Sequence, residues 1–301
     1  MRQMVQQLLA AEVGEVLLDE PLAKYTTWKI GGAADVLVIP QGKAQLAETM
    51  RILHSHGQPV TMIGRGSNML VSDKGVRGFV VMLGQGFDYI RFDGATVTAG
   101  GAVSFIVLAV KAAKAGLTGL EFAGGIPGTV GGAVYMNAGA LGSDMSRILK
   151  EAEIVLETGE TVRLSKDEME FAYRHSLLHK RPGIVTEAVM ELELGDRKQI
   201  DAAMAANKER RQRTQPLHLA SAGSTFRNPE GHFAAKLIEE AGLKGYRIGE
   251  AEVSTLHANF IINNGGAKAS DVLQLIDHIR YTVLDKFGVS LTPEVLFVGE
   301  K

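Results

Sequence analysis

An uncharged segment from Gly124 to Gly139, which contains six glycines, constrains this chain more than any other feature of its sequence. Glycine has no Cβ, so its backbone can approach a planar ring or a diphosphate where a side chain would block the way. Ile126, Val130, Val134 and Met136 lie in the same segment and need burial, which a flexible linker does not provide. We therefore expect folded backbone laid against a bound ligand, with a linker as the alternative.

A second segment, Gly64-Arg65-Gly66-Ser67-Asn68, directly follows an apolar run over residues 60–63. Small residues with free N–H groups after a strand can form an anion-binding concavity for a pyrophosphate. The segment fits neither the P-loop nor the Rossmann fingerprint, because Met69 occupies the place of the third glycine. Taken alone, an ordinary tight turn is the alternative. Together, the two Gly-rich segments predict a dinucleotide that lies between domains.

Composition bounds the class of protein. A chain of 301 residues exceeds the size at which one core stops growing, so two or three domains are expected. The net charge of −2 gives no basic field that would attract nucleic acid or anionic lipid. The absence of cysteine excludes disulfides, Cys-ligated zinc, iron–sulfur clusters and thiol catalysis, so redox chemistry needs a bound cofactor. The longest apolar stretch, residues 103–110, is too short for a membrane span, and no signal peptide is expected.

The first two of three blocks combine α/β and β-type patterns. Residues 35–83 alternate short apolar runs with a helical stretch over 43–56, which is typical of an α/β unit. From 89 to 164, β-type runs separated by Asp-Gly or Thr-Gly predict hairpins, interrupted by one helix over 103–115. The alternation over 184–194 predicts one long strand that closes the second block.

The third block is mainly helical. It starts with a charged helix over 201–213 and ends with two amphipathic helices, one over 234–241 and one capped by Ser270. Residues 257–263 between them predict a strand. The last apolar run, 295–298, is too short to stand alone, and we expect it to complete the sheet of the first block.

Polar residues among small or apolar neighbours recur in three distant segments, Tyr173-Arg174-His175-Ser176, residues 222–229 and residues 291–295. This pattern predicts a buried polar centre where the three segments converge. Two structural alternatives remain: Arg174 and Glu294 could form an ion pair, and Ser224 could be a turn or cap residue. A serine hydrolase is disfavoured because the Gly-x-Ser-x-Gly pattern is absent. No metal site is indicated.

With Tyr25-Thr26-Thr27-Trp28-Lys29-Ile30-Gly31-Gly32, these motifs together resemble the UDP-N-acetylenolpyruvoylglucosamine reductase family, in the family's order and over nearly the whole chain. The resemblance implies an α+β enzyme of three domains. Two domains of the vanillyl-alcohol-oxidase type of FAD fold are expected over 1–84, completed by 295–301, and over 85–197. A substrate-binding α/β domain is expected over 198–294.

The resemblance also implies a cofactor, a reductant and a reaction. FAD is held non-covalently, NADPH reduces it, and UDP-N-acetylglucosamine enolpyruvate is then reduced to UDP-N-acetylmuramate in peptidoglycan precursor synthesis. Arg174 and Glu294 match the residues that hold and polarise the substrate carboxylate, and Ser224 matches the proton donor. Tyr173, Asn228 and His257 match substrate-binding positions. The implied FAD contacts are Gly64, Arg65, Gly66, Ser67, Asn68, Gly124, Gly125, Ile126, Pro127, Gly128, Gly131, Gly132, Asn137, Ala138 and Gly139.

The chain resembles the shorter form of the family, which lacks an extra loop whose Tyr closes over the UDP moiety. Lys208, Arg211 and Arg213 are then candidates for the diphosphate clamp, with a solvated helix face as the alternative. Two other functions remain open, a flavin oxidase of the same fold and a non-enzymatic binding module. We expect a monomeric cytoplasmic enzyme with no nucleic-acid or membrane partner.

Overall fold

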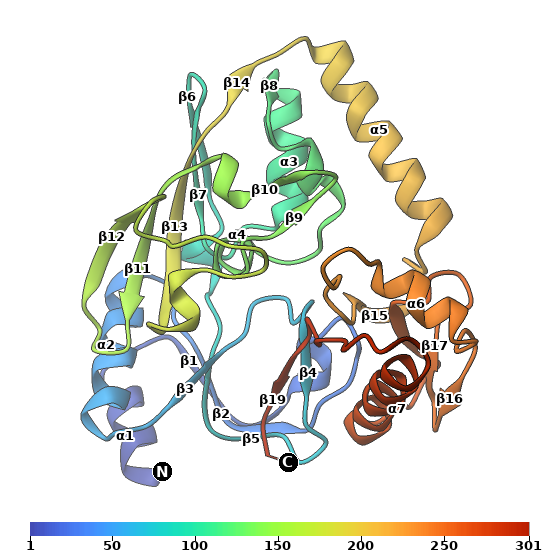
Figure 1. Cartoon of the computed structure of the whole chain (residues 1–301). Coiled ribbons are helices and arrows are strands. Elements are labelled where there is room, and N and C mark those ends of the chain that lie inside the picture. The colour runs from blue at the N-terminus through green and yellow to red at the C-terminus, as the bar shows by residue number, and fades with distance from the viewer. Residues whose placement is uncertain (301) are drawn as a thin grey trace. The chain divides into compact units, whose positions relative to one another are not determined.

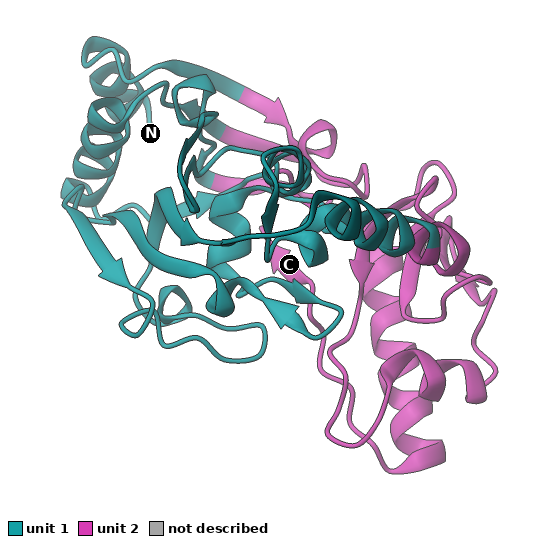
Figure 2. Cartoon of the chain, turned by 90° about the horizontal axis from the view of Figure 1, so that it is seen from above, with its two compact units in different colours: residues 1–18, 36–64, 78–209 teal, residues 19–35, 65–77, 210–301 magenta. Residues whose placement is uncertain are grey.

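The computed structural model describes residues 1–300, which form two compact units, each assembled from separate stretches of the chain (Figure 2). Unit 1 comprises residues 1–18, 36–64 and 78–209, and unit 2 comprises residues 19–35, 65–77 and those from 210 onward. The chain passes from one unit to the other inside several of its elements. These are β1 (Glu15–Pro21), β2 (Ala33–Ile39), β5 (Val76–Val81) and α5 (Arg197–Thr214).

The first core of unit 1 includes buried residues of two helices, α1 (Arg2–Ala10) and α2 (Lys43–Ser55), which are at the lower left of Figure 1. Leu46, Met50 and Leu53 recur on one face of α2 and are buried, which confirms the helix predicted there. The sequence did not indicate α1, although Met4, Val5 and Leu8 are buried on it. Strands β1, β2, β5 and β3 (Val60–Met62) form a four-stranded sheet in that order, in which β3 and β5 run parallel.

The second sheet of unit 1 is antiparallel, with the order β12-β11-β13-β7-β6. Its strands are β6 (Ile90–Asp93), β7 (Thr96–Gly100), β11 (Leu149–Leu156), β12 (Thr161–Ser165) and β13 (Gly183–Glu191). The hairpin predicted at Asp93-Gly94 is confirmed, and Gly94 has a φ of +57° there. The single strand predicted over 184–194 is wrong, because Leu192 separates β13 from β14 (Glu193–Leu194), which pairs with β8 (Leu117–Thr118).

Helix α3 (Phe105–Lys114) packs into the core of this second sheet. The remaining short elements of unit 1 lie in the Gly-rich segment 124–139 or in other connections between the strands and helices. They are η2 (Gln85–Phe87), η3 (Glu121–Gly125), α4 (Val130–Tyr135), β9 (Gly139–Ala140), β10 (Ser143–Asp144), η4 (Met145–Arg147) and η5 (Leu177–His179).

Unit 2 packs α6 (Ala234–Glu240) and α7 (Ala269–Phe287) with an antiparallel sheet of order β15-β18-β17-β16. Its strands are β15 (Ala220–Ser224), β16 (Arg247–Ile248), β17 (Ala251–Val253) and β18 (Phe260–Asn263). Trp28 is buried in this core, and its indole Nε1 donates to the carbonyl of Ile261 at 2.8 Å. The strand predicted over 257–263 is shorter than expected, because residues before Phe260 form a turn.

The end of the chain and the start of α7 differ from the predictions. Ser270 does not cap α7; the helix begins at Ala269, and the carboxylate of Asp73 accepts from the N–H groups of both residues, at 2.7 and 2.9 Å. Strand β19 (Leu296–Val298) does return to the first predicted block, but it pairs with β4 (Met69–Val71) in a separate parallel pair. Helix η1 (Leu22–Tyr25) completes unit 2. Within residues 1–300, no helix is long and apolar enough to span a membrane.

Candidate active site

The two Gly-rich segments meet inside unit 1, at Gly64 and Thr129. A Cβ placed on Gly64 would lie 3.0 Å from the hydroxyl oxygen of Thr129. That hydroxyl also accepts from the N–H of Gly132 at 3.2 Å and so caps α4. Val130 and Val134 on α4 are fully buried. The segment is therefore folded backbone, as predicted, and the linker alternative is wrong.

Several glycines of this segment lie close to other parts of the protein. A Cβ on Gly131 would lie 3.1 Å from the carbonyl oxygen of Gly101, and one on Gly124 would lie 2.7 Å from the methyl carbon of Met204. A Cβ on Gly139 would lie 2.5 Å from the carbonyl oxygen of Ser143. Packing against neighbouring protein atoms thus contributes to the glycine content of residues 124–139.

The rest of the shorter Gly-rich segment, residues 65–68, belongs to unit 2. Gly66 is buried with a φ of +53°, and a Cβ there would lie 2.5 Å from the carbonyl oxygen of Tyr25. Asn68 donates from Nδ2 to the carbonyl of Glu294 at 3.1 Å, and its own carbonyl accepts from the N–H of Leu296 at 3.0 Å. Asn68 therefore holds the main chain on which Glu294 is carried.

Two of the three predicted polar segments are neighbours in unit 2. Ser224 ends β15, and the carbonyl of the next residue, Thr225, accepts from the N–H of Glu294 at 2.8 Å. Phe226 and Pro293 form a β-bridge beside this bond. The hydrogen bond between Glu294 and Thr225 thus brings the main chain of Glu294 next to that of Ser224.

A residue that sequence reasoning missed, Asn259, fixes this arrangement. Its side chain is buried, accepts from the N–H of Phe226 at 2.9 Å and donates to the carbonyl of Phe226 at 2.8 Å. Its main-chain carbonyl accepts from the N–H of Thr225 at 2.7 Å. The available signal was an amide side chain between two apolar residues, Ala258 and Phe260.

The third polar segment lies in unit 1, where Arg174 occupies the corner of a tight hairpin. Arg174 has a φ of +54°, a conformation uncommon for residues with a Cβ. Its Nη2 donates to the carbonyl of Gly139 at 2.9 Å, and its guanidinium carbon lies 5.0 Å from the centre of the Tyr173 ring. The side chain of Tyr173 is more than half exposed, at 54%.

The other predicted substrate positions have defined partners in unit 2. Asn228 is exposed, and its Oδ1 accepts from the N–H of Ala234, the first residue of α6, at 3.0 Å. His257 is half-buried, and its Nδ1 accepts from the N–H of Asn259 at 3.3 Å. Burial lowers the pKa of the His257 imidazole, which favours the neutral ring at physiological pH.

The three diphosphate candidates on α5 differ in their surroundings. Lys208 and Arg213 are exposed, as expected for a solvated helix face. Arg211 is half-buried, burial lowers its pKa, and within residues 1–300 its Nε–H has no hydrogen-bond partner. Arg227, which sequence reasoning did not single out, also has a buried Nε–H that has no hydrogen-bond partner among residues 1–300. Buried N–H groups are normally hydrogen-bonded, so each of these two Nε–H groups can still donate to an acceptor.

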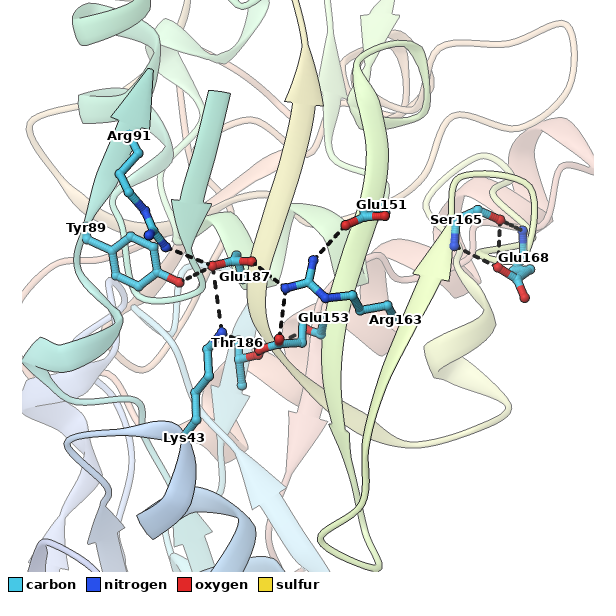
Figure 3. Close-up of polar contacts among 10 residues, drawn as sticks. All are labelled: Lys43, Tyr89, Arg91, Glu151, Glu153, Arg163, Ser165, Glu168, Thr186 and Glu187. Carbon is cyan, nitrogen blue, oxygen red and sulfur yellow. Dashed lines mark hydrogen bonds and ion pairs between the residues drawn. The ribbon is translucent and has the colours of Figure 1, made fainter. Parts of the chain in front are cut away.

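A separate charged cluster in unit 1 is satisfied internally (Figure 3). Glu153 on β11 and Glu187 on β13 are opposite one another in the sheet, and both are buried. Lys43 Nζ lies 2.6 Å from Glu153, and Arg163 Nη2 lies 3.1 Å from Glu153 and 3.0 Å from Glu187. Burial and the hydrogen bond to Glu187 raise the pKa of Tyr89 to about 12. Because its charges are paired with one another, the cluster is structural.

No three His, Cys, Asp or Glu side chains of residues 1–300 are grouped as a metal ion would require.

Comparison with known proteins defines the class and then the family. Residues 34–165 match the family model of the FAD binding domain, so the chain is an FAD-binding protein of the predicted fold type. Residues 215–298 match the model of the UDP-N-acetylenolpyruvoylglucosamine reductase C-terminal domain. The chain is 53% identical to the UDP-N-acetylenolpyruvoylglucosamine reductase of Bacillus licheniformis, over 100% of both chains. It is 51% identical to that of Bacillus subtilis, over 99% of both. The chain therefore belongs to the UDP-N-acetylenolpyruvoylglucosamine reductase family, and the resemblance inferred from its motifs is confirmed.

A solved structure supports the same assignment. The UDP-N-acetylenolpyruvylglucosamine reductase of Thermus caldophilus superposes with a TM-score of 0.81 at 36% identity, covering 94% of this chain and 98% of that one. A variant of berberine bridge enzyme matches 65% of this chain and 44% of its own, with a TM-score of 0.50 at 12% identity. That second likeness is one of fold alone.

Proposed function

We propose that Arg174, Glu294 and Ser224 carry the chemistry of this chain, the NADPH-dependent reduction of UDP-N-acetylglucosamine enolpyruvate to UDP-N-acetylmuramate through FAD. The reaction serves peptidoglycan precursor synthesis. One observation carries the assignment of residues, the 2.8 Å hydrogen bond from the N–H of Glu294 to the carbonyl of Thr225, next to Ser224. It brings the main chain that carries Glu294 next to the main chain that carries Ser224, which supports a role for both residues in one step that polarises a substrate and then protonates it.

The residues of the Gly-rich segments fit FAD. Gly64 has no side chain, so its backbone lies close to Thr129. Residues 124–139 carry no charge. The left-handed conformation of Gly66 is of the kind that aims successive backbone amides at an anion such as a diphosphate. When bound, FAD supplies the hydride, taken from NADPH, to the methylene carbon of the enolpyruvyl group. The sequence has no cysteine for a thioether link, in keeping with non-covalent binding.

The side chains of the protein have three tasks in this proposal. Arg174 presents a fixed cation to the carboxylate of the substrate and stabilises the negative charge that builds beside it. Glu294 holds and polarises the same carboxylate, which requires it to be protonated or hydrogen-bonded there. Ser224 gives its proton to the carbon that becomes negative. A hydroxyl is a weak acid, so its position and its neighbours must assist it.

Arg211 is our proposal for the residue that binds the diphosphate of the substrate. Among the described residues 1–300 its buried Nε–H has no partner, which favours it over Lys208 and Arg213, which are exposed. A hydrogen bond from a charged donor is worth about 1.5–3 kcal/mol, so Arg211→Met should raise the KM for the UDP-sugar about 10- to 100-fold. Arg213→Met is the matched control and should leave KM within about twofold. Equal effects of the two substitutions would exclude a special role for Arg211.

We propose three substrate contacts, Tyr173, Asn228 and His257. We also propose three domains: the first comprises residues 1–84 and 295–301, the second residues 85–197, and the third residues 198–294. The packing of the described residues follows a different division, because residues 19–35 and 65–77 belong to the same compact unit as α6 and α7. We also propose that the enzyme is cytoplasmic, since UDP-sugars and NADPH are found in the cytoplasm. Its proposed oligomeric state is a monomer. Light scattering of the FAD-loaded protein would give the mass of one chain, 32.3 kDa, or a multiple that excludes the monomer.

An anaerobic absorbance experiment tests the proposed roles. NADPH should bleach the bound flavin, and the enolpyruvyl UDP-sugar should restore its colour. Ser224→Ala should leave the bleaching step nearly intact and slow the recovery, because only the second step consumes the proton. Equal loss in both steps would refute the proton-donor role. Recovery of the wild-type protein with oxygen but not with the UDP-sugar would favour a flavin oxidase instead.

A further inference from the structure

The end of the Gly-rich segment 124–139 holds the hairpin of Arg174 at three points, all within unit 1. Ser176 donates from its hydroxyl to the carbonyl of Tyr135 at 2.7 Å. Asn137 donates from Nδ2 to the carbonyl of Ala172 at 3.0 Å. Arg174 itself donates to the carbonyl of Gly139 at 2.9 Å. Every second residue from 135 to 139 therefore contacts the segment that carries the guanidinium.

Asn137 is the member of this set with a side-chain role. It is 3% exposed, and both polar atoms of its amide are engaged within the protein. Oδ1 accepts from the N–H of Ser146 at 2.9 Å while Nδ2 reaches Ala172. Its φ of +44° lies in the left-handed region, which Asn tolerates better than most residues with a Cβ. The amide thus links η4 to the base of the Arg174 hairpin and has a defined place between them.

The hairpin that it holds is tight and conformationally unusual. Ala172 and His175 exchange two backbone hydrogen bonds of 3.1 Å, which leaves Tyr173 and Arg174 as its two corner residues. Arg174 is left-handed there, a conformation that persists when surrounding contacts hold it. The bond from Asn137 falls on the carbonyl of Ala172 at the base of the hairpin, and so fixes the direction in which its corner points.

We propose that Asn137 is a positioning residue for Arg174, so that the segment assigned to FAD binding also sets the place of the guanidinium that meets the substrate carboxylate. Asn137 acts through the Ala172 carbonyl rather than by touching the reacting atoms. This inference rests on the proposed role of Arg174. It gives Asn137 a function different from the direct FAD contact expected from the sequence.

Three variants separate the parts of this proposal. Asn137→Gly keeps a residue that accepts the left-handed backbone but removes both side-chain bonds. Asn137→Asp keeps an acceptor for the N–H of Ser146 but sets an oxygen against the carbonyl of Ala172. Ser146→Ala is the matched control, because Asn137 binds the main chain of Ser146 while the hydroxyl of Ser146 contacts Asp144.

The half-reactions give the first readout, measured on FAD-loaded protein. In both Asn137 variants, recovery of the flavin colour with the enolpyruvyl UDP-sugar should slow about 10- to 100-fold, the loss expected when a catalytic group is displaced by about 1 Å. Bleaching by NADPH and the affinity for FAD should stay within about threefold of wild type, a change of well under 1 kcal/mol. Ser146→Ala should match the wild type in all three quantities.

Hydrogen exchange of the peptide that contains residues 172–176 gives a second readout that does not depend on activity. It should be faster in both Asn137 variants and unchanged in Ser146→Ala. Wild-type recovery rates in Asn137→Asp would overturn the proposal, because the bond to Ala172 would then be dispensable. Loss of FAD with equal slowing of both half-reactions would also overturn it and indicate a cofactor contact. If the wild-type flavin did not respond to the UDP-sugar, the proposed function would fail, and unchanged exchange in Asn137→Gly would separately refute the positioning role.

Discussion

Replacing Lys43 by Met should destabilise the protein at neutral pH, because it removes a cation from between two buried carboxylates. Lys43 Nζ lies 2.6 Å from Glu153 and 3.7 Å from Glu187, whose side chains are 9% and 6% exposed. Removing one partner from a buried pair costs about 3–5 kcal/mol. Arg163 still contacts both carboxylates in the variant, and the side chain of Lys43 is 43% exposed to water. We therefore expect a smaller loss, about 1–2 kcal/mol.

The loss should depend on pH in a defined direction. Burial raises the pKa of Glu153 and of Glu187, but hydrogen bonds and charges from Lys43, Arg163 and their neighbours outweigh it and hold both values below normal. A carboxyl group with a lowered pKa in the folded state adds stability above its unfolded pKa and loses it as the pH falls through the folded value. Lys43→Met should therefore cost most near pH 7 and progressively less below about pH 4.3.

Urea unfolding at pH 7 and at about pH 3, well below the unfolded carboxyl pKa, measures both effects, with FAD loading matched between proteins. Lys150→Met is the control, because Lys150 forms a 2.7 Å ion pair with Glu191 in which the two side chains are 54% and 59% exposed. An exposed pair contributes about 0–1 kcal/mol, so this variant should stay near wild type at both pH values. Similar losses in the two variants, or a loss in Lys43→Met that is the same at both pH values, would refute the reasoning.

Three further substitutions test contacts within a single unit. Gly64→Ala should weaken FAD binding about tenfold or more in a fluorescence titration. The new Cβ would lie 3.0 Å from Thr129 Oγ1, and overpacking of this kind costs about 1–3 kcal/mol. Unchanged affinity would place the flavin elsewhere. Asp73→Ala should lower the free energy of unfolding by about 1 kcal/mol, because it removes acceptors 2.7 and 2.9 Å from the first amides of α7. Trp28→Phe should cost about 1–3 kcal/mol by leaving the buried Ile261 carbonyl, an acceptor at 2.8 Å, without its donor. Calorimetry would detect either loss, and a wild-type melting temperature would contradict the contact concerned.

The regular elements with strong apolar periodicity could be predicted from the sequence. Helix α2 lies over 43–55 where 43–56 was expected, because Leu46, Met50 and Leu53 recur at helical spacing. Strand β15, Ala220–Ser224, could not be predicted, since its residues are small or polar and it is a strand only because β18 pairs with it. Helix α1 was missed because its polar residues obscured three buried apolar positions.

The candidate site was predicted as a set of residues but not as a set of contacts. The motifs predicted Arg174, Ser224 and Glu294 as site residues, a prediction that awaits its test. Nothing in the pattern indicated that Asn259 would bind both main-chain groups of Phe226 from 33 residues away. Glycine content indicated close backbone approach without saying to what, and at Gly131 the neighbour is the carbonyl of Gly101. Such contacts depend on register and turn geometry, which local spacing does not determine.

The interleaving of the two units has a consequence for how the protein is made. Trp28 leaves the ribosome long before Ile261, its hydrogen-bond partner 233 residues further along the chain. At about 5–20 residues per second, the interval is about 10–50 s. During that time Trp28 and Ile30, both buried in the finished core of unit 2, have none of α6, α7 or β18 to cover them. Nascent chains of intermediate length should therefore expose apolar side chains that ribosome-associated chaperones can bind.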